Sequence, residues 1–190
     1  MSSLPLFPTD SRCGAIIEGV YRYRLWRPGY IRPPHIADAV SDARGGWRLL
    51  FVMFNPSKAD ALDDDPTLRQ CIAFARRWGF ERLDVVNLYA LRATDPKTIA
   101  RNADPIGAHN DRHLVDAVGR ADRVVLAWGA ANKAGQSFAV SVEQRARAVC
   151  EIIRAVQGER SIVCLGVCDD GQPRHPLRLA HTTEAIPWAT

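Results

Sequence analysis

The sequence has no long apolar run. None of its hydrophobic stretches approaches the roughly 20 residues that a membrane helix needs. The N-terminus contains no basic segment that leads into a continuous apolar one, so a secretory signal is not expected. Hydrophobic residues make up 47% of the chain and charged residues 24%, which is the balance of a globular protein in water. We therefore expect no membrane partner and a cytoplasmic location.

Several common catalytic motifs are also missing. The chain has no glycine-rich phosphate loop, no zinc-metallopeptidase helix and no Gly-x-Ser-x-Gly elbow, which removes the commonest kinase, protease and α/β-hydrolase functions. The 5 cysteines are scattered, as reduced thiols are, and do not suggest a disulfide framework. Cys164 and Cys168 lack the second close pair that would complete a zinc site. We expect neither a metal nor another cofactor.

Positive and negative side chains nearly balance, with 25 Lys and Arg against 21 Asp and Glu. The formal net charge is +4 and the chain shows no long basic stripe, so its charge permits an anionic partner without demanding one. A length of 190 residues suits one α/β domain with a substantial core. We expect a loose N-terminal arm over residues 1–12 and a single domain over residues 13–190.

Apolar patterns of strand and helix type alternate along the chain. Such alternation predicts a single three-layer α/β/α domain with a mainly parallel central sheet. The expected strands cover residues 47–54, 83–88, 122–127 and 161–165, and the expected helices cover residues 67–78, 109–118 and 142–156. Asp64 or Asp65 is placed to cap the first of these helices, with Pro66 in its first turn and Gly79 after its end.

The N-terminal segment 14–26 reads as one strand, because aromatic or apolar residues alternate with basic ones over its second half. We expect it to form an antiparallel pair with the strand at 47–54. Strict alternation would place Val20, Arg22 and Arg24 on one face of that strand, so two guanidinium groups would share this face. The other face would carry Tyr21, Tyr23 and Leu25.

Two segments are the leading candidates for a site. Asn55 follows the apolar run 51–54 and opens an Asn-Pro-Ser turn, which places its carboxamide at the carboxyl edge of the sheet, where open α/β folds bind ligands. His175 lies in a loop between Pro173 and Pro176, and its imidazole could donate a hydrogen bond to a leaving group. The alternatives are that Asn55 only caps a turn and that His175 is a surface histidine.

Other polar residues near strand ends extend this candidate site. Asp60 is a second-choice catalytic acid. The acidic run Asp63–Asp65 could hold a divalent cation, but helix capping accounts for at least one of its carboxylates more simply. Trp128 could stack on a ring or plug the sheet edge, and an arginine at 92 can hold phosphate bidentately. The expected substrate-binding residues are Ser57, Arg22, Arg92, Thr94, Trp128 and Arg174.

The chain is identified as a member of the bacterial and phage family called domain of unknown function 1643. The resemblance covers about residues 13–188, and the family implies no settled activity. The motifs that carry it are Tyr21-Arg22-Tyr23, Asn55-Pro56-Ser57-Lys58-Ala59-Asp60, Asp64-Asp65-Pro66-Thr67, Asn87-Leu88, Arg92-Ala93-Thr94-Asp95-Pro96, Ala127-Trp128-Gly129 and His175-Pro176-Leu177.

More distantly, the chain resembles the uracil-DNA glycosylase superfamily, which implies a parallel sheet flanked by helices. Asn55-Pro56 matches the centre of the Gly-x-Asn-Pro-Gly motif of its mismatch-specific branch, and His175-Pro176 matches the start of a His-Pro-Ser-Pro motif. By this similarity Asn55 would position the attacking water and His175 would hydrogen-bond the departing base. Met53 and Ser57 replace the two glycines of the first motif, and Leu177 replaces the serine of the second.

These residues lead to one main hypothesis and two competitors. The main hypothesis is a protein that recognises a nucleobase, nucleotide or nucleic acid and hydrolyses an N-glycosidic bond in modified DNA or a nucleotide. The first competitor is a non-catalytic binding module that uses the same crevice. The second is a metal-dependent phosphohydrolase built on Asp60 and the run Asp63–Asp65.

Overall fold

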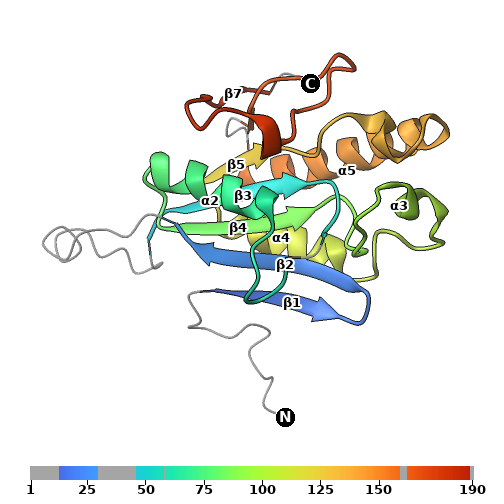
Figure 1. Cartoon of the computed structure of the whole chain (residues 1–190), viewed down its shortest axis with the longest axis horizontal. Helices are drawn as coiled ribbons and strands as arrows, with labels where there is room; N and C mark the ends of the chain where they lie inside the picture. Colours follow the sequence, from blue (N-terminus) through green and yellow to red (C-terminus); the bar gives the residue numbers. More distant parts are fainter. Residues whose placement is uncertain (1–12, 30–45, 58, 159–161, 189–190) are drawn as a thin grey trace, which may run out of the picture.

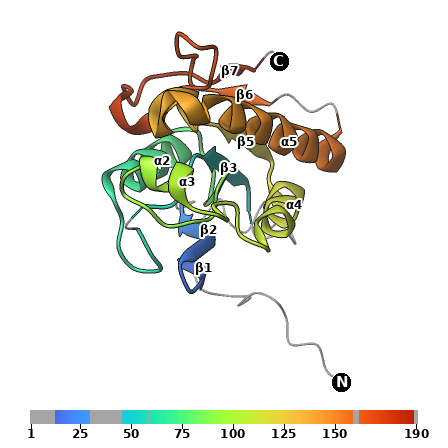
Figure 2. The same ribbon diagram turned by 90° about the vertical axis from the view of Figure 1, so that its right-hand side faces the viewer.

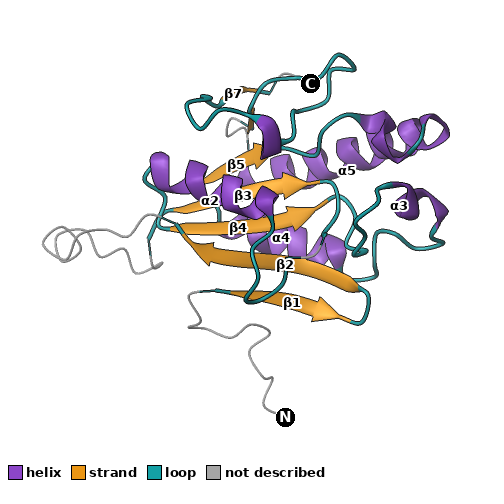
Figure 3. Ribbon diagram, in the orientation of Figure 1, coloured by secondary structure: helices purple, strands orange, loops and turns teal. Residues whose placement is uncertain are grey.

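The computed structural model of the chain describes residues 13–29, 46–57, 59–158 and 162–188. Within these residues seven strands form one sheet, in the order β1-β2-β4-β3-β5-β6-β7 (Figures 1 and 3). The expected N-terminal arm, residues 1–12, lies outside the described part. The strands are β1 (Gly14–Glu18), β2 (Tyr21–Pro28), β3 (Arg48–Met53), β4 (Arg82–Asn87), β5 (Arg123–Leu126), β6 (Val163–Cys164) and β7 (Ile186–Pro187).

The centre of the sheet is parallel and its edges are antiparallel. β3 pairs in parallel with β4 and β5, and β5 pairs in parallel with β6. β2 runs antiparallel to β4, as β1 does to β2 and β7 does to β6. The chain therefore has the mixed α/β architecture that its alternating patterns predict.

Helices cover both faces of the sheet (Figure 2). On one face α2 packs against alternate strand residues such as Leu49 and Phe51. On the other, α4 and α5 pack against the intervening residues, such as Leu50 and Val52. β3 is apolar on both sides because both of its faces are covered. The helices are α2 (Pro66–Arg77), α3 (Lys97–Arg101), α4 (Asn110–Arg120) and α5 (Ala139–Gln157), with short 3₁₀ helices η1 (Ala131–Ala134), η2 (Gln136–Phe138) and η3 (Pro176–Arg178).

The predicted start and end of α2 are confirmed. The Asp65 carboxylate accepts a hydrogen bond from the Leu68 N–H at 2.8 Å, and Pro66 occupies the first turn. Gly79 follows the end of the helix with φ +74°, a conformation that costs glycine little. The capped N-terminus of α2 therefore lies near the carboxyl edge of the sheet, where Asp65 and Asn55 line the same cavity.

The expected antiparallel pair between residues 14–26 and 47–54 is wrong. Residues 14–26 form two strands, β1 and most of β2, joined by a turn at Gly19, where φ is +56°. β2 pairs with β4, because both edges of β3 are occupied by its parallel neighbours β4 and β5. The antiparallel N-terminal pair exists, but it is the β1–β2 hairpin.

The expected shared face of Arg22 and Arg24 is also wrong. Ile16 pairs with Arg24 and the next residue, Ile17, pairs with Arg22, so Tyr23 is an extra residue in β2. Such a bulge breaks the two-residue alternation of the strand. The two guanidinium groups consequently point to opposite faces of the sheet.

The bulge gives the two arginines different partners. Arg24 forms ion pairs at 3.1 Å with Asp84 and with Asp116 of α4. Arg22 lies on the α2 face, where it lines a cavity. In the described part of the chain, no helix is both long enough and apolar enough to cross a membrane.

Candidate functional site

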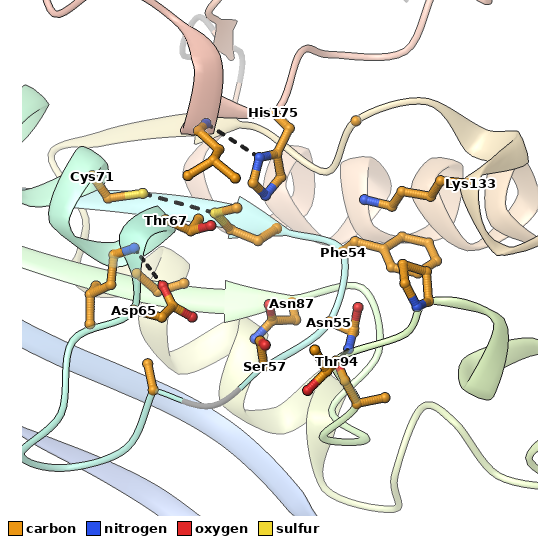
Figure 4. A pocket seen from close by; sticks show the side chains of 18 of the residues that line it. Phe54, Asn55, Ser57, Asp65, Thr67, Cys71, Asn87, Thr94, Lys133 and His175 are labelled. Carbon is orange, nitrogen blue, oxygen red and sulfur yellow. Dashed lines mark hydrogen bonds between the residues drawn. The ribbon is translucent and has the colours of Figure 1, made fainter.

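A cavity of about 700 Å³ opens at the carboxyl edge of the sheet, beside the ends of β3 and β4 (Figure 4). This is the edge at which the parallel strands of an α/β sheet deliver side chains to a ligand. Its polar lining comes from several separate segments of the chain, and includes Arg22, Asn55, Ser57, Asp65, Thr67, Asn87, Thr94, Lys133, Cys168, His175 and Arg178.

Asn55 is held in one orientation. Its Nδ2 donates to the carbonyl oxygens of Pro56 at 2.9 Å and Ala93 at 2.7 Å. Both amide hydrogens are used in this way, so the Oδ1 end of the carboxamide is turned to the cavity (Figure 4). Asn55 therefore presents a fixed hydrogen-bond acceptor to whatever the cavity holds.

His175 presents a donor from the opposite wall. Its Nδ1 accepts a hydrogen bond from the Leu177 N–H at 3.3 Å, so a neutral ring carries its proton on Nε2. Burial, together with the charge of the neighbouring Lys133, lowers the pKa of His175 to about 4, although Asp65 opposes this shift. At neutral pH the imidazole is uncharged, and its Nε2–H is available to a ligand in the cavity.

Asn87 is the last residue of β4 and the most unusual polar group of the site. Its side chain is 1% exposed and lines the cavity, yet neither Oδ1 nor Nδ2 has a hydrogen-bond partner among the described residues. The strand end itself is fixed, because Asn110 of α4 donates to the backbone oxygens of Asn87 and Leu88 at 3.1 Å each. The backbone of Asn87 is therefore fixed, while its carboxamide has no hydrogen-bond partner in the described part of the chain.

Arg22 brings a buried positive charge to the same cavity. The side chain is 5% exposed, its NH1 donates to the Ala59 carbonyl oxygen at 2.6 Å, and its Nε has no partner in the described structure. Burial lowers the pKa of Arg22 to about 10, and the Asp65 carboxylate acts against this shift. The guanidinium stays charged at neutral pH, and its Nε–H remains available as a hydrogen-bond donor to a ligand.

Lys133, from η1, forms part of the wall on the His175 side (Figure 4). Its Nζ donates to the Trp128 carbonyl oxygen and lies 4.1 Å from the centroid of the Phe54 ring. Burial lowers the pKa of this amine to about 7. The charge of Lys133 is therefore sensitive to pH in the neutral range, unlike that of His175.

The structure brings five of the predicted site residues together and leaves four outside. The cavity is lined by Asn55, His175, Ser57, Arg22 and Thr94, and not by Asp60, Arg92, Trp128 and Arg174.

Two of the outlying residues serve their own loops. Asp60 accepts hydrogen bonds from the backbone N–H groups of Leu62 at 2.9 Å and Asp63 at 3.0 Å, which lower the pKa of its carboxyl group and shape the turn before α2. Arg174 donates from Nε to the Val167 carbonyl oxygen at 2.9 Å. Neither side chain lines this cavity.

Trp128 belongs to the core and does not line this cavity. The side chain is 1% exposed, and its Nε1 donates to Gln172 Oε1 at 2.8 Å. Its ring packs edge-on against Trp188, with centroids 6.3 Å apart. Of the two alternatives for this residue, plugging the sheet edge is the one observed.

Two carboxylates of the acidic run before α2 are engaged in protein contacts. Asp64 forms an ion pair with the Arg27 Nε at 2.7 Å, and Asp65 caps the helix. Among the described residues no three or more His, Cys, Asp or Glu side chains group in a way that could hold a metal ion.

Sequence reasoning missed Asn87 and Lys133 as cavity residues, and it considered Asp65 only as a helix cap or a metal ligand. Asn87 carried a usable signal, since it is a polar residue at the end of an apolar strand. Asn55 lies in a similar position, two residues after the end of β3. Lys133 carried none, because a lysine in the polar segment between Asn132 and Ala134 is typical of a surface turn.

Comparison with protein families gives one match. The family model described as "Protein of unknown function (DUF1643)" matches residues 22–177. The matched span begins at Arg22 and ends at Leu177, both of which line the cavity. Neither a curated protein nor a solved structure matches the chain.

Proposed function

The chain belongs to the DUF1643 family, and we propose that its cavity binds a nucleobase, as part of a nucleotide or nucleic acid, and hydrolyses the N-glycosidic bond of the bound group. This site lies at the end of the parallel strands, where it is sheltered by α2, η1 and the His175 loop. Its volume of about 700 Å³ lies within the usual range for small-molecule sites.

The unpartnered carboxamide of Asn87 is the observation that carries this proposal. A buried polar group without a partner costs a protein about 1–3 kcal/mol, a cost that a ligand with matching groups would remove. A carboxamide places a donor and an acceptor side by side, and this pattern pairs bidentately with the edge of a base. Asn87 is therefore the base-reading residue of the proposed site.

Asn55 and His175 supply the chemistry. The Asn55 Oδ1 accepts a hydrogen bond from a water molecule and orients its oxygen toward the anomeric carbon. The C–O bond forms as the C–N bond breaks, and the electron pair of that bond leaves with the base. The His175 Nε2–H donates a hydrogen bond to the charge that develops on the base. The base leaves with a proton and the sugar keeps a hydroxyl group, so one water is consumed.

We further propose that the architecture is uracil-DNA-glycosylase-like. Two observations support this: helices cover both faces of the sheet, and the two segments that resemble glycosylase motifs, Asn55-Pro56 and His175-Pro176, contribute to the same cavity. Fold similarity alone would not establish the reaction, which is why the proposal depends on the site.

Detection of free base by mass spectrometry tests the reaction. The purified chain is incubated with nucleotides and oligonucleotides that carry deaminated, alkylated or hypermodified bases. We expect release of one base, with losses of at least about 100-fold in Asn55→Ala and His175→Ala, since each removes a group that acts in the transition state. Arg112→Gln is the control, because Arg112 lies on the exposed side of α4 and does not line the cavity, so its substitution should leave release unchanged.

The outcomes separate the two main functions. Release that survives both substitutions would refute the assigned roles of Asn55 and His175. A base or nucleotide that binds with no release would leave the non-catalytic binding module as the function of this cavity. The same Asn87 contact would then serve recognition without turnover.

A further inference from the structure

We propose that the physiological ligand is a free nucleotide that ends in a phosphate monoester, and that Arg22 holds this terminal phosphate while Asn87 reads the base. The inference rests on the proposed function, because it assumes that the cavity binds a base. It goes further by choosing a small anionic nucleotide over a nucleic-acid strand.

The hydrogen bonding of Arg22 leaves a place for an anion. One terminal nitrogen, NH1, is engaged by the Ala59 carbonyl oxygen, whereas Nε is buried without a partner in the described structure. A guanidinium presents its donors in a planar fork that fits two oxygens of one phosphate group. An unpaired donor on a buried cation costs the protein more than an unpaired neutral amide such as that of Asn87, and an oxyanion would satisfy it.

The depth of Arg22 favours a terminal phosphate over a phosphodiester. The side chain is 5% exposed, so a phosphate that reaches it must leave the solvent almost completely. An internal phosphate of a strand is linked to sugars on both sides, and contacts to it are usually made by groups at the protein surface. A phosphate monoester is linked to only one sugar, so the phosphate can enter the cavity while the sugar lies closer to the opening.

Arg22 and Asn87 occupy one face of the sheet at the same edge. β2 and β4 are hydrogen-bonded neighbours, and the backbone N–H of Arg22 donates to the Ala90 carbonyl oxygen just beyond the end of β4 at 2.9 Å. The bulge at Tyr23 turns Arg22 to the face that Asn87 and Met53 occupy. The Arg22 guanidinium and the Asn87 carboxamide can thus bind the same ligand in one cavity.

Asp65 is the acidic group that faces Arg22 across this part of the cavity. Its carboxylate raises the pKa of Arg22 against the effect of burial, which keeps the guanidinium charged when the cavity is empty. It also opposes the approach of an anion. We therefore expect Asp65→Asn, in which the side chain can still cap α2, to strengthen phosphate binding rather than weaken it.

Calorimetric binding to the full chain tests the inference. The probes are a panel of nucleoside 5′-monophosphates, the matching nucleosides and free bases, and single-stranded oligonucleotides with hydroxyl ends, so that their only phosphates are internal. Where a probe is turned over, the measurement is repeated in Asn55→Ala. We expect the monophosphate to bind at least about 10-fold more tightly than its nucleoside, the gain of a charge-assisted bidentate contact.

Variants of Arg22 assign that gain to one side chain. Arg22→Gln should abolish the difference between monophosphate and nucleoside, and Arg22→Lys, which keeps the charge but not the fork, should give an intermediate value. Arg112→Gln removes the same charge from the exposed side of α4 and should change nothing. Unfolding midpoints of all variants show whether a loss of binding reflects a loss of fold.

Two results would overturn the inference while leaving the proposed function intact. One is a nucleoside or an oligonucleotide that binds as tightly as the monophosphate. The other is a preference for the monophosphate that persists in folded Arg22→Gln. If no base, nucleoside or nucleotide of the panel binds at all, the proposed function fails together with this inference.

Discussion

Asn55 donates from Nδ2 to the carbonyl oxygen of Ala93 at 2.7 Å, and this contact decides which end of the carboxamide faces the cavity. The second donor of the same group is bound to the Pro56 carbonyl oxygen at 2.9 Å. A loop that follows β3 is thereby tied to the loop that follows β4. Asn55 is at once a structural link between two loops and the acceptor of the proposed site.

Asn55→Asp tests this double role. A carboxylate would place oxygen atoms against two carbonyl oxygens, so we expect the free energy of unfolding at pH 7 to fall by about 1–3 kcal/mol. The folded-state pKa of the new carboxyl group should lie above its unfolded value, because its protonated form alone can donate. The deficit relative to wild type should therefore shrink as pH falls. Urea unfolding at matched pH values measures it, and a deficit that does not change with pH would contradict this reading.

Asn87→Leu should separate stability from binding. Leucine has nearly the shape of asparagine and no polar atom to leave unpaired, so the substitution should raise the free energy of unfolding by about 1–3 kcal/mol. The same substitution should abolish binding of bases and nucleotides. Thermal unfolding and calorimetry on one preparation provide both values. A destabilised Asn87→Leu would show that the carboxamide has a partner inside the protein and is not waiting for a ligand.

Lys133 should make stability depend on pH in the neutral to alkaline range. Its folded pKa, about 7, lies below the unfolded value near 10.5, so between these values the unfolded chain binds more protons. Stability should then rise with pH through this window, by at most about 1.4 kcal/mol per pH unit. Lys133→Met should remove that slope, as measured by unfolding at pH 7, 8 and 9. An unchanged slope in the variant would assign it to other groups.

His175 should contribute to acid sensitivity in a lower window. Its folded pKa is about 4 and the ordinary value is 6.5, so the unfolded chain binds the extra proton between these values. The free energy of unfolding should fall as pH drops through this range, and that of His175→Gln should fall less steeply than that of the wild type. Because the ring is neutral above this range, base release should not depend on His175 titration between pH 6 and 8. A loss of activity near pH 6.5 that His175→Gln abolishes would refute the lowered pKa.

Trp128→Phe should affect the fold and spare the ligand. The substitution removes the hydrogen bond to Gln172 and part of the contact with Trp188, and we expect a loss of about 1–3 kcal/mol in stability. Ligand affinity should stay within about 2-fold of wild type, since Trp128 does not line the cavity. A large loss of affinity in a folded variant would show that the ring reaches the ligand after all.

The local elements could be predicted because their signals lie within a few residues of sequence. Leu68, Cys71, Ile72 and Ala75 mark the buried side of α2, and all four are buried as their spacing indicates. The strand partners could not be predicted in the same way. The pairing of β2 with β4 depends on hydrogen bonds between segments more than 50 residues apart, and no local pattern specifies it.

The site was predictable only where a residue interrupts a pattern. Asn55 and His175 do so, at the end of an apolar run and between prolines. For Trp128 the sequence left two alternatives open, because the end of a strand does not say which face a side chain takes, and this ring lies in the cluster packed by α4 and α5. Lys133 becomes part of the cavity only when η1 folds over Phe54, a relation between distant segments.

The extra residue at Tyr23 makes chain length a determinant of the charge in the cavity. Deletion of one residue from β2 would restore strict alternation, and the guanidinium of Arg22 would then point to the side of the sheet that Arg24 faces. A lineage could therefore lose or regain the positive charge of this cavity by a single-residue deletion or insertion in the hairpin, with every side chain of the site retained. Relatives with and without this extra residue in β2 should differ in the charge of the molecules they accept.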